Sequence, residues 1–534
     1  MSDETRRLAD AQALASRARI SRRSFIQLAL AAGLAPVAAH GLFTRAARAE
    51  PRKGGTLRLA LGHGATTDTL DPATYPDQYT GTTMWGTLSN SLTEIDAKSN
   101  AVPDLALSIE PADGARRWIV KLRPGVTFHK GKAVTPEDVI GSLRHHMGEG
   151  SKSAAASLLK PVTDIRADGP SSVVIELEAG NADFPYVLSD YHLPIMPVVD
   201  GKADWQSGDR TGPYVLESFE PGVRSSFTRN PNYYKSDRAH FDAVIALVVA
   251  DVAARTSALV AGEVDYLDSA DLKSLHLLQK NPNVAISEQT GYGHYLFPMR
   301  VTVPPFDNKD VRLALKHSID RNDILEKVFL SHGLVANDNP ISPAVKFAID
   351  PKPRHVYDPD KARSFLRKAG FETLKIDLST AEAAFAGSVD SALLWKEHAS
   401  KAGIDLNVIR EANDGYWDNV WMKKPLVGSY WAGRPTCDWL FTAIYAADAP
   451  WNETQWKNPR FNELLVQARS EADEDKRAAM YAEMQQLVHD DGGVVNVMFT
   501  NFVDAHSAKL AHAEVAANWP LDGLKIAERW WFAA

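Results

Sequence analysis

Residues 429–438 read SYWAGRPTCD and bring aromatic, cationic and anionic side chains into one short segment. Arg434 offers a planar guanidinium, which can bind a carboxylate or a phosphate through two parallel hydrogen bonds. Asp438 could bind a cation, or it could neutralise Arg434 within the loop. Gly433 would allow a close approach of backbone, and Pro435 would stiffen the loop. The segment therefore predicts either a preformed ligand-binding loop or an internal ion pair.

The sequence contains none of the common catalytic patterns, neither H-E-x-x-H nor G-x-S-x-G nor a P-loop. His145 and His146 are adjacent, so on a helix they point about 100° apart and cannot chelate one ion. His129 is expected to be structural. Cys437 is the single cysteine, which excludes an internal disulfide and a thiolate cluster. We therefore predict no catalysis, no cofactor and no metal; a secreted hydrolase would require a nucleophile–base pair that the sequence does not show.

The N-terminus has the features of an export signal. Arg22 and Arg23 form a twin-arginine pattern, and the apolar run 26–39 that follows has roughly 14 residues, whereas a membrane span needs about 20. Residues 47–49, Ala-Arg-Ala, match a signal-peptidase site. We therefore expect residues 1–49 to be a Tat signal peptide. The mature protein would be periplasmic, and it would not be a lipoprotein, since no cysteine lies near the cleavage site.

The remainder of the chain is acidic. Of 59 Lys and Arg and 67 Asp and Glu residues, the segment 1–49 holds 8 and 3, so the rest carries a net charge near −13. Such a charge disfavours a phosphate-backbone partner, so we expect no nucleic-acid binding. We expect a soluble monomer with large hydrophobic cores.

Strand-like and helical segments alternate along the chain, which predicts an α/β fold. Helix starts are marked by capping residues followed by proline or acidic residues, as in Thr135-Pro136 and Asp358-Pro359. The expected strands are 54–61, 118–122, 172–177, 241–249, 375–378 and 494–499. The expected helices are 135–147, 307–319, 358–369, 458–468 and 475–489.

Six segments resemble, in order, family 5 of the extracellular solute-binding proteins, which serve peptide-, nickel- and opine-type ABC importers. They are 54–57 with 70–72, 103–106 with 121–139, 211–215 with 229–233, 258–265, 305–321 and 357–359. Together they span almost all of the mature chain.

The resemblance implies a type II clamshell of the large class, with two lobes and an extra subdomain that does not touch the ligand. The first lobe's main subdomain would comprise 50–90, 207–297 and 505–534. The extra subdomain would be 91–206, and the second lobe 298–504. A crossover between the lobes is expected at 291–295, where glycines permit backbone change. Trp530, Trp531 and Phe532 would anchor the C-terminal tail in the first core.

The family also implies a function: a periplasmic substrate-binding component that captures a peptide or peptide-like solute and delivers it to an ABC permease in the inner membrane. In peptide-binding relatives, an aspartate shortly after a cleft aromatic binds the peptide's ammonium. Here Trp431 holds the aromatic position and Arg434 replaces the aspartate. This departure favours an alternative ligand, a carboxylated solute such as an opine or an amino-acid conjugate.

Aromatic residues near these segments are further candidates for the cleft. The loop after the first strand contains Tyr75, Tyr79 and Trp85, although Trp85 could equally belong to the core. Trp417 and Trp421 are candidates in the second lobe. The predicted ligand-binding residues are Tyr79, Trp85, Tyr295, Trp431, Gly433, Arg434, Asp438 and Trp439.

Overall fold

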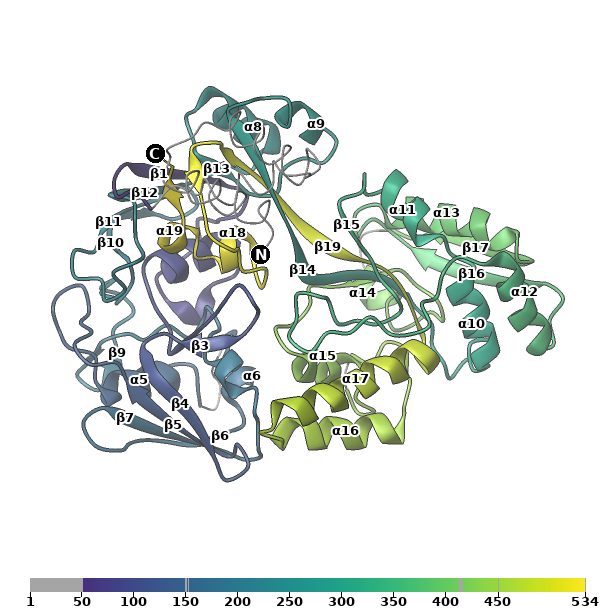
Figure 1. The fold of residues 1–534 in the computed structure, drawn as a ribbon, viewed down its shortest axis with the longest axis horizontal. Coiled ribbons are helices and arrows are strands. Elements are labelled where there is room, and N and C mark those ends of the chain that lie inside the picture. The colour runs from purple at the N-terminus through teal and green to yellow at the C-terminus, as the bar shows by residue number, and fades with distance from the viewer. Residues whose placement is uncertain (1–50, 149–150, 152, 413–415, 450, 534) are drawn as a thin grey trace, which may run out of the picture.

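The computed structural model describes residues 51–148, 151, 153–412, 416–449 and 451–533. The expected signal peptide, residues 1–49, lies outside the described residues. Figure 1 shows two lobes, joined by the long strands β14 (Val284–Pro298) and β19 (Val494–Ser507). This is the two-lobed α/β arrangement that the sequence predicts. Among the described residues, no helix is both long enough and apolar enough to cross a membrane.

The largest sheet begins in the first lobe. β1 (Thr56–Leu61) runs parallel to β12 (Ala243–Val248) on one side and to β13 (Tyr266–Leu267) on the other. Beyond β12, the strands β11 (Arg224–Arg229) and β10 (Tyr214–Glu220) continue the sheet antiparallel. The apolar residues of β1 are fully buried, because this strand has a parallel neighbour on each side and lies at the centre of the lobe.

β14 and β19 carry the same sheet into the second lobe. They pair antiparallel along almost their whole length, with a register shift between Thr290 and His294. The predicted crossover lies in this part of β14, where a Cβ on Gly293 would come within 2.6 Å of the Thr500 hydroxyl. β18 (Ser429–Trp431) pairs with β14 and β15 (Gly333–Val335) with β19. The sheet therefore leads directly to the start of the SYWAGRPTCD segment.

A second, four-stranded sheet forms a unit of its own, which we call the β4–β7 unit. Its strand order is β4 (Ala106–Ala112), β5 (Arg117–Leu122), β7 (Ser172–Leu177) and β6 (Val162–Ala167). The helix α5 (Pro136–Arg144) packs on it and begins after Thr135 with Pro136, as expected from the sequence. Thr135 and Asp138 also form a capping box. Its smaller elements are β2 (Thr93–Ile95), β3 (Ala101–Pro103), α6 (Ala156–Leu159), α7 (Phe184–Val187), β8 (Val198–Val199) and β9 (Lys202–Ala203).

The second lobe surrounds the parallel pair β16 (Leu374–Thr380) and β17 (Ile404–Arg410) with helices. The predicted helix at 358–369 is α12 (Pro359–Lys368), capped by Asp358 and followed by Gly370 at φ 90°. The other helices are α10 (Lys309–His317), α11 (Arg321–Lys327), α13 (Ser388–Ser400), α14 (Tyr416–Asn419), α15 (Cys437–Ile444), α16 (Pro459–Ser470) and α17 (Glu474–Asp491).

The C-terminal tail returns to the first lobe (Figure 1). Trp530 is fully buried there and Trp531 nearly so, while Phe532 packs against the same core, so the expected anchoring role is confirmed. Lys525 forms buried ion pairs with Glu94 and Asp104, which tie the tail to the start of the β4–β7 unit. The remaining elements of this lobe are a 3₁₀ turn (Pro72–Thr74), α4 (Gln78–Thr80), a π-helix (Gly81–Thr87), α8 (Val252–Ala261), α9 (Leu275–Leu278), β20 (Leu510–Ala511), α18 (Pro520–Gly523), α19 (Ile526–Arg529) and β21 (Trp531–Phe532).

Candidate ligand-binding site

Two adjoining cavities lie between the lobes. The arginine chamber, named for Arg434, has a volume of about 390 Å³. The aromatic chamber, which contains Tyr295 and Trp431, has a volume of about 380 Å³. Each has a size typical of small-molecule sites, roughly 300–1,000 Å³. The chambers adjoin because they share three wall residues, Tyr191, Ala432 and Trp519.

The walls of the arginine chamber come from both lobes and from the C-terminal tail. The second lobe contributes the loop 432–435 with Trp439 and Trp451, and the tail contributes Asn518 and Trp519. The opposite wall consists of Ile95, Ala154, Ser157, Leu158, Tyr186, Ser189, Asp190, Tyr191 and His192. Residues of the range 91–206, in α6 and around α7, thus line this chamber, whereas the resemblance implies an extra subdomain that does not touch the ligand.

Arg434 has no carboxylate partner among the described residues. Its Nη1 donates a hydrogen bond to the carbonyl of Gly433 at 2.6 Å, and its guanidinium lies 5.9 Å from the centre of the Trp439 ring. Burial lowers the pKa of Arg434, and no neighbouring charge offsets this effect. A cation held in this way can bind an anionic group that enters the chamber.

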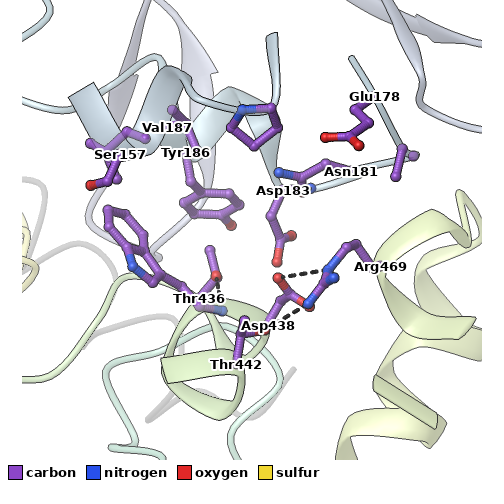
Figure 2. A pocket seen from close by; sticks show the side chains of 15 residues that line it. Ser157, Glu178, Asn181, Asp183, Tyr186, Val187, Thr436, Asp438, Thr442 and Arg469 are labelled. Atoms are coloured by element: carbon purple, nitrogen blue, oxygen red, sulfur yellow. Dashed lines mark hydrogen bonds and ion pairs between the residues drawn. The ribbon is translucent and has the colours of Figure 1, made fainter. Parts of the chain in front are cut away.

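Asp438 belongs to a third cavity, the side pocket, which lies between the β4–β7 unit and α15–α16 (Figure 2). Its carboxylate accepts a hydrogen bond from Nε of Arg469 at 3.1 Å. Burial raises the pKa of Asp438 to about 6, although Arg469 partly opposes the shift. The alternative in which Asp438 neutralises Arg434 is therefore wrong, since α15 turns the carboxylate toward Arg469.

The backbone of the 432–435 loop is fixed by close packing. Gly433 has φ 84°, and a Cβ at this position would come within 2.3 Å of Tyr292 on β14. Only glycine combines this conformation with this approach. Thr436 then caps α15 by accepting a hydrogen bond from the Trp439 backbone N–H. The loop therefore holds Arg434 and Trp439 at the chamber before any solute arrives.

The aromatic chamber contains two of the predicted residues. The Tyr295 ring stacks on Phe385 with centroids 4.4 Å apart. The Trp431 indole N–H donates to Glu453 at 2.8 Å, and the β18–β14 pairing places Trp431 opposite His294. Both residues line this cavity between the lobes.

Comparison with known proteins agrees with this geometry. The model of the bacterial extracellular solute-binding proteins, family 5 middle region, matches residues 100–453. The chain belongs to family 5. A di/tripeptide-binding protein from Pseudomonas aeruginosa is 25% identical over 78% of this chain and 84% of its own length. The oligopeptide-binding protein AppA from Bacillus subtilis is 23% identical over 91% and 93%.

Solved structures show the same fold. The binding protein DppA from Helicobacter pylori, in complex with the peptide STSA, covers 90% of this chain and 99% of its own at 20% identity, with a TM-score of 0.68. AgaA from A. tumefaciens R10, in complex with agropinic acid, covers 90% and 99% at 20% identity, with a TM-score of 0.67. The family 5 clamshell predicted from the sequence is thus confirmed.

Two predicted cleft residues lie elsewhere in this family 5 protein. Tyr79 and Trp85 are buried in the first core, where the Tyr79 hydroxyl is 2.7 Å from Ser225 Oγ. The Trp85 indole N–H donates to Ser91 Oγ at 2.8 Å. The segment after β1 folds into α4 and the π-helix rather than an open loop, and this turns both rings inward. Pro76, Asp77 and Gln78 line the aromatic chamber instead. Tyr75 is also buried.

Several wall residues were not anticipated from the sequence. The aromatic chamber also contains Tyr191, Tyr430, Phe502 and Trp519, which come from four separate parts of the chain. Tyr430 belongs to the SYWAGRPTCD segment, whereas no local pattern marks the other three, which the arrangement of the two lobes brings together. Of the second-lobe candidates, Trp417 is partly exposed beside Tyr430, and Trp421 contacts Trp431.

The histidines that were considered for chemistry have structural contacts. Nε2 of His129 lies 3.0 Å from the carbonyl of Gly212, and Nε2 of His145 lies 2.7 Å from Asp71. Within the described ranges, no group of three or more His, Cys, Asp or Glu side chains could hold a metal ion.

Proposed function

We propose that this protein is the periplasmic substrate-binding component of an ABC importer, which encloses a peptide-like or carboxylated solute between its lobes. Membership of family 5 and the cavities between the lobes support this function. The solute would be released unchanged to a permease in the inner membrane. The protein would act as a monomer without a nucleic-acid partner, in keeping with its acidic charge.

The observation that carries the ligand class is the guanidinium of Arg434 in the cleft, which has no carboxylate partner among the described residues. A peptide can meet this requirement with its carboxylate. A carboxylated non-peptide solute meets it equally well and brings no ammonium group to be repelled. AgaA, the structural neighbour in complex with agropinic acid, supports a carboxylated non-peptide solute as the second candidate. In both cases Arg434, Gly433 and Trp439 would contact the anionic end, and Tyr295 and Trp431 the rest of the solute.

Solute binding would favour the closed form by contacting both lobes. A shift of such an equilibrium from 1:99 to 99:1 requires a difference of about 5.5 kcal/mol in binding free energy between the two forms. A thermal-shift screen of di- and tripeptides, N-acylated peptides and opines, followed by calorimetry, should identify the solute. Small-angle scattering should then show a monomer whose radius of gyration falls on binding. Hydrolysis of a binding compound, or an unchanged radius despite confirmed binding, would contradict the proposal.

Export would use the Tat route without a lipid anchor. The twin arginines at 22 and 23, the apolar run and the absence of cysteine near residue 49 support this localisation. Replacement of Arg22 and Arg23 by lysine should leave the precursor in the cytoplasm. Normal accumulation of the mature form outside the cytoplasm would contradict the Tat assignment.

A further inference from the structure

The aromatic chamber differs from the arginine chamber in the chemistry of its walls. Six of its side chains are aromatic: Tyr191, Tyr295, Tyr430, Trp431, Phe502 and Trp519. Its charged residue, Asp77, already accepts hydrogen bonds from the backbone N–H groups of Gly64 and Thr80. Gln78 donates to Asp268. Asp77 and Gln78 are therefore occupied by the protein, which leaves the aromatic rings, the tyrosine hydroxyls and Thr500 for a solute.

A buried carboxylate stands behind this wall. Glu453 is 3% exposed and accepts three hydrogen bonds, from the indole N–H groups of Trp431 and Trp421 and from the hydroxyl of Ser429. The three distances are 2.8, 2.5 and 2.8 Å respectively. Burial raises the pKa of Glu453, and the three donors oppose this shift.

Glu453 has no cationic partner in the part of the chain that the structure describes, so only neutral donors hold it. A buried carboxylate without a counter-ion is costly, and it is tolerated where its oxygens are fully hydrogen-bonded. Two of these hydrogen bonds come from Trp421, which contacts Trp431 of β18, and from Ser429, which lies in β18. The same bonds fix the orientation of the Trp431 indole, because its only polar atom points at Glu453.

The fixed indole belongs to a continuous series of rings. Trp431 contacts Trp421 at a centroid distance of 6.3 Å and Trp451 at 5.9 Å, and Trp421 contacts Trp417 at 5.6 Å. Since its N–H is engaged behind the wall, Trp431 can offer a solute only apolar ring surface. Such surfaces favour offset or edge-to-face contact with another flat ring.

We infer that the aromatic chamber is a subsite for a flat apolar group of the solute, and that Glu453 is the positioning residue that holds its Trp431 wall. The inference rests on the proposed function, because it requires the cleft to bind a solute. Since the two chambers adjoin, the solute class becomes more specific: a carboxylate at Arg434, joined to an aromatic or similarly flat group.

The test uses three probes: N-acetyl-Ala-Phe, N-acetyl-Ala-Ala, and N-acetyl-Ala-Phe amide. Burial of the phenyl ring should make the first bind about 10-fold or more tightly than the second to the wild-type protein. The amide lacks the carboxylate and should bind at least about 10-fold more weakly than the acid. Calorimetry measures each affinity.

Glu453→Gln separates positioning from general stability. The amide NH₂ faces indole donors that need an acceptor, so the Trp431 ring loses its fixed orientation. We expect affinity for the Phe probe to fall about 3- to 10-fold, with the Ala probe changed less than about 2-fold. Trp431→Phe, which keeps a ring without the N–H, should give a smaller loss of the same preference, and it serves if Glu453→Gln does not fold.

The matched control is Asp504→Asn, another buried carboxylate held by neutral donors, Tyr266 Oη and the Ser269 N–H, outside both chambers. It should leave the Phe-to-Ala preference unchanged. No binding of any probe to the wild type would overturn both the carboxylate site and this inference. Equal binding of the Phe and Ala probes would overturn the inference alone. A preference that survives intact in Glu453→Gln and Trp431→Phe would overturn the positioning role.

Discussion

The contact between the lobes has two ends, which differ in whether the arginine side chains have carboxylate partners. At the side pocket, Arg469 pairs with Asp438, and nearby Arg477 on α17 pairs with Asp183 of the β4–β7 unit. Arg477 and Asp183 are both buried. At the arginine chamber, Arg434 has no such partner among the described residues. At the first end the arginines are neutralised within the protein; at the second, we propose that the carboxylate of a solute neutralises Arg434.

The difference assigns distinct tasks to the two ends. The Arg477–Asp183 pair crosses between the lobes, and the backbone N–H of Ala182 also donates to the carbonyl of Arg469 at 2.8 Å. These contacts favour the arrangement in which the lobes touch. Arg434 is partly desolvated and has no carboxylate partner among the described residues, so an anion that enters the chamber can form the missing ion pair.

The largest effect should come from breaking the ion pair between Arg477 and Asp183. Arg477→Ala leaves the Asp183 carboxylate without its partner, which costs about 3–5 kcal/mol while the site stays buried. The lobes can relieve this cost by separating. We expect a larger radius of gyration without solute and a lower free energy of unfolding, measured by scattering and urea titration.

Two variants control this experiment. Removing both charges with Asp183→Ala and Arg477→Ala together should restore part of the loss, because no unpaired buried charge remains. Arg460→Ala, which breaks exposed ion pairs with Glu463 and Glu483 within the second lobe, should not change the radius. An Arg477→Ala protein with the wild-type radius and stability would show that the pair does not hold the lobes.

The next largest effect should come from replacing Arg434 in the arginine chamber. Arg434→Ala should weaken binding of a carboxylated solute by about 2–5 kcal/mol, because the anion is then desolvated without a partner. Arg434→Lys keeps the charge and loses the planar fork, so its affinity should lie between wild type and alanine. Stability should change little, since Arg434 has no carboxylate partner to strand. Calorimetry with parallel thermal melts measures both quantities; wild-type affinity in the alanine variant would return this loop to a structural role.

The sequence predicted those features that depend on local patterns or on the family. Thr135 followed by Pro136 marks the start of α5, and Asp358 with Gly370 bounds α12. Arg434 was identified because it departs from a family position. Its lack of a partner could not be predicted, since four-residue spacing favours pairing with Asp438 only if the loop continues as a helix. Thr436 instead starts α15 between the two residues.

The errors have a similar cause. Tyr79 and Trp85 lie in a Thr- and Gly-rich segment that is typical of a loop, yet tertiary packing against the C-terminal tail makes it helical and buried. A Cβ on Gly86 would come within 1.9 Å of the Leu524 carbonyl, a contact more than 400 residues away that no sequence window contains. Glu453 was missed for the same reason: its three partners are brought together only by the second-lobe fold.

The smallest expected effect is a pH dependence of stability that arises from Asp438 in the side pocket. Burial raises the pKa of Asp438 to about 6, with Arg469 opposing the shift and Asp183 adding to it. Between about pH 4 and pH 6 the folded protein therefore keeps a proton on Asp438 that the unfolded chain has released. Stability from this group is fully present below about pH 4 and is lost as the pH rises through 6.

Asp438→Asn removes this titration and keeps an acceptor oxygen for Arg469. The free energy of unfolding of the variant, relative to wild type, should therefore rise by about 1–3 kcal/mol between pH 4 and pH 7. Urea titrations at pH 4, 5, 6 and 7 measure the difference, in which all other titrating groups cancel. A constant difference across this range would mean that Asp438 is ionised throughout. The side pocket would then be as well compensated as the Arg477–Asp183 pair beside it, and the contrast with Arg434 would be sharper still.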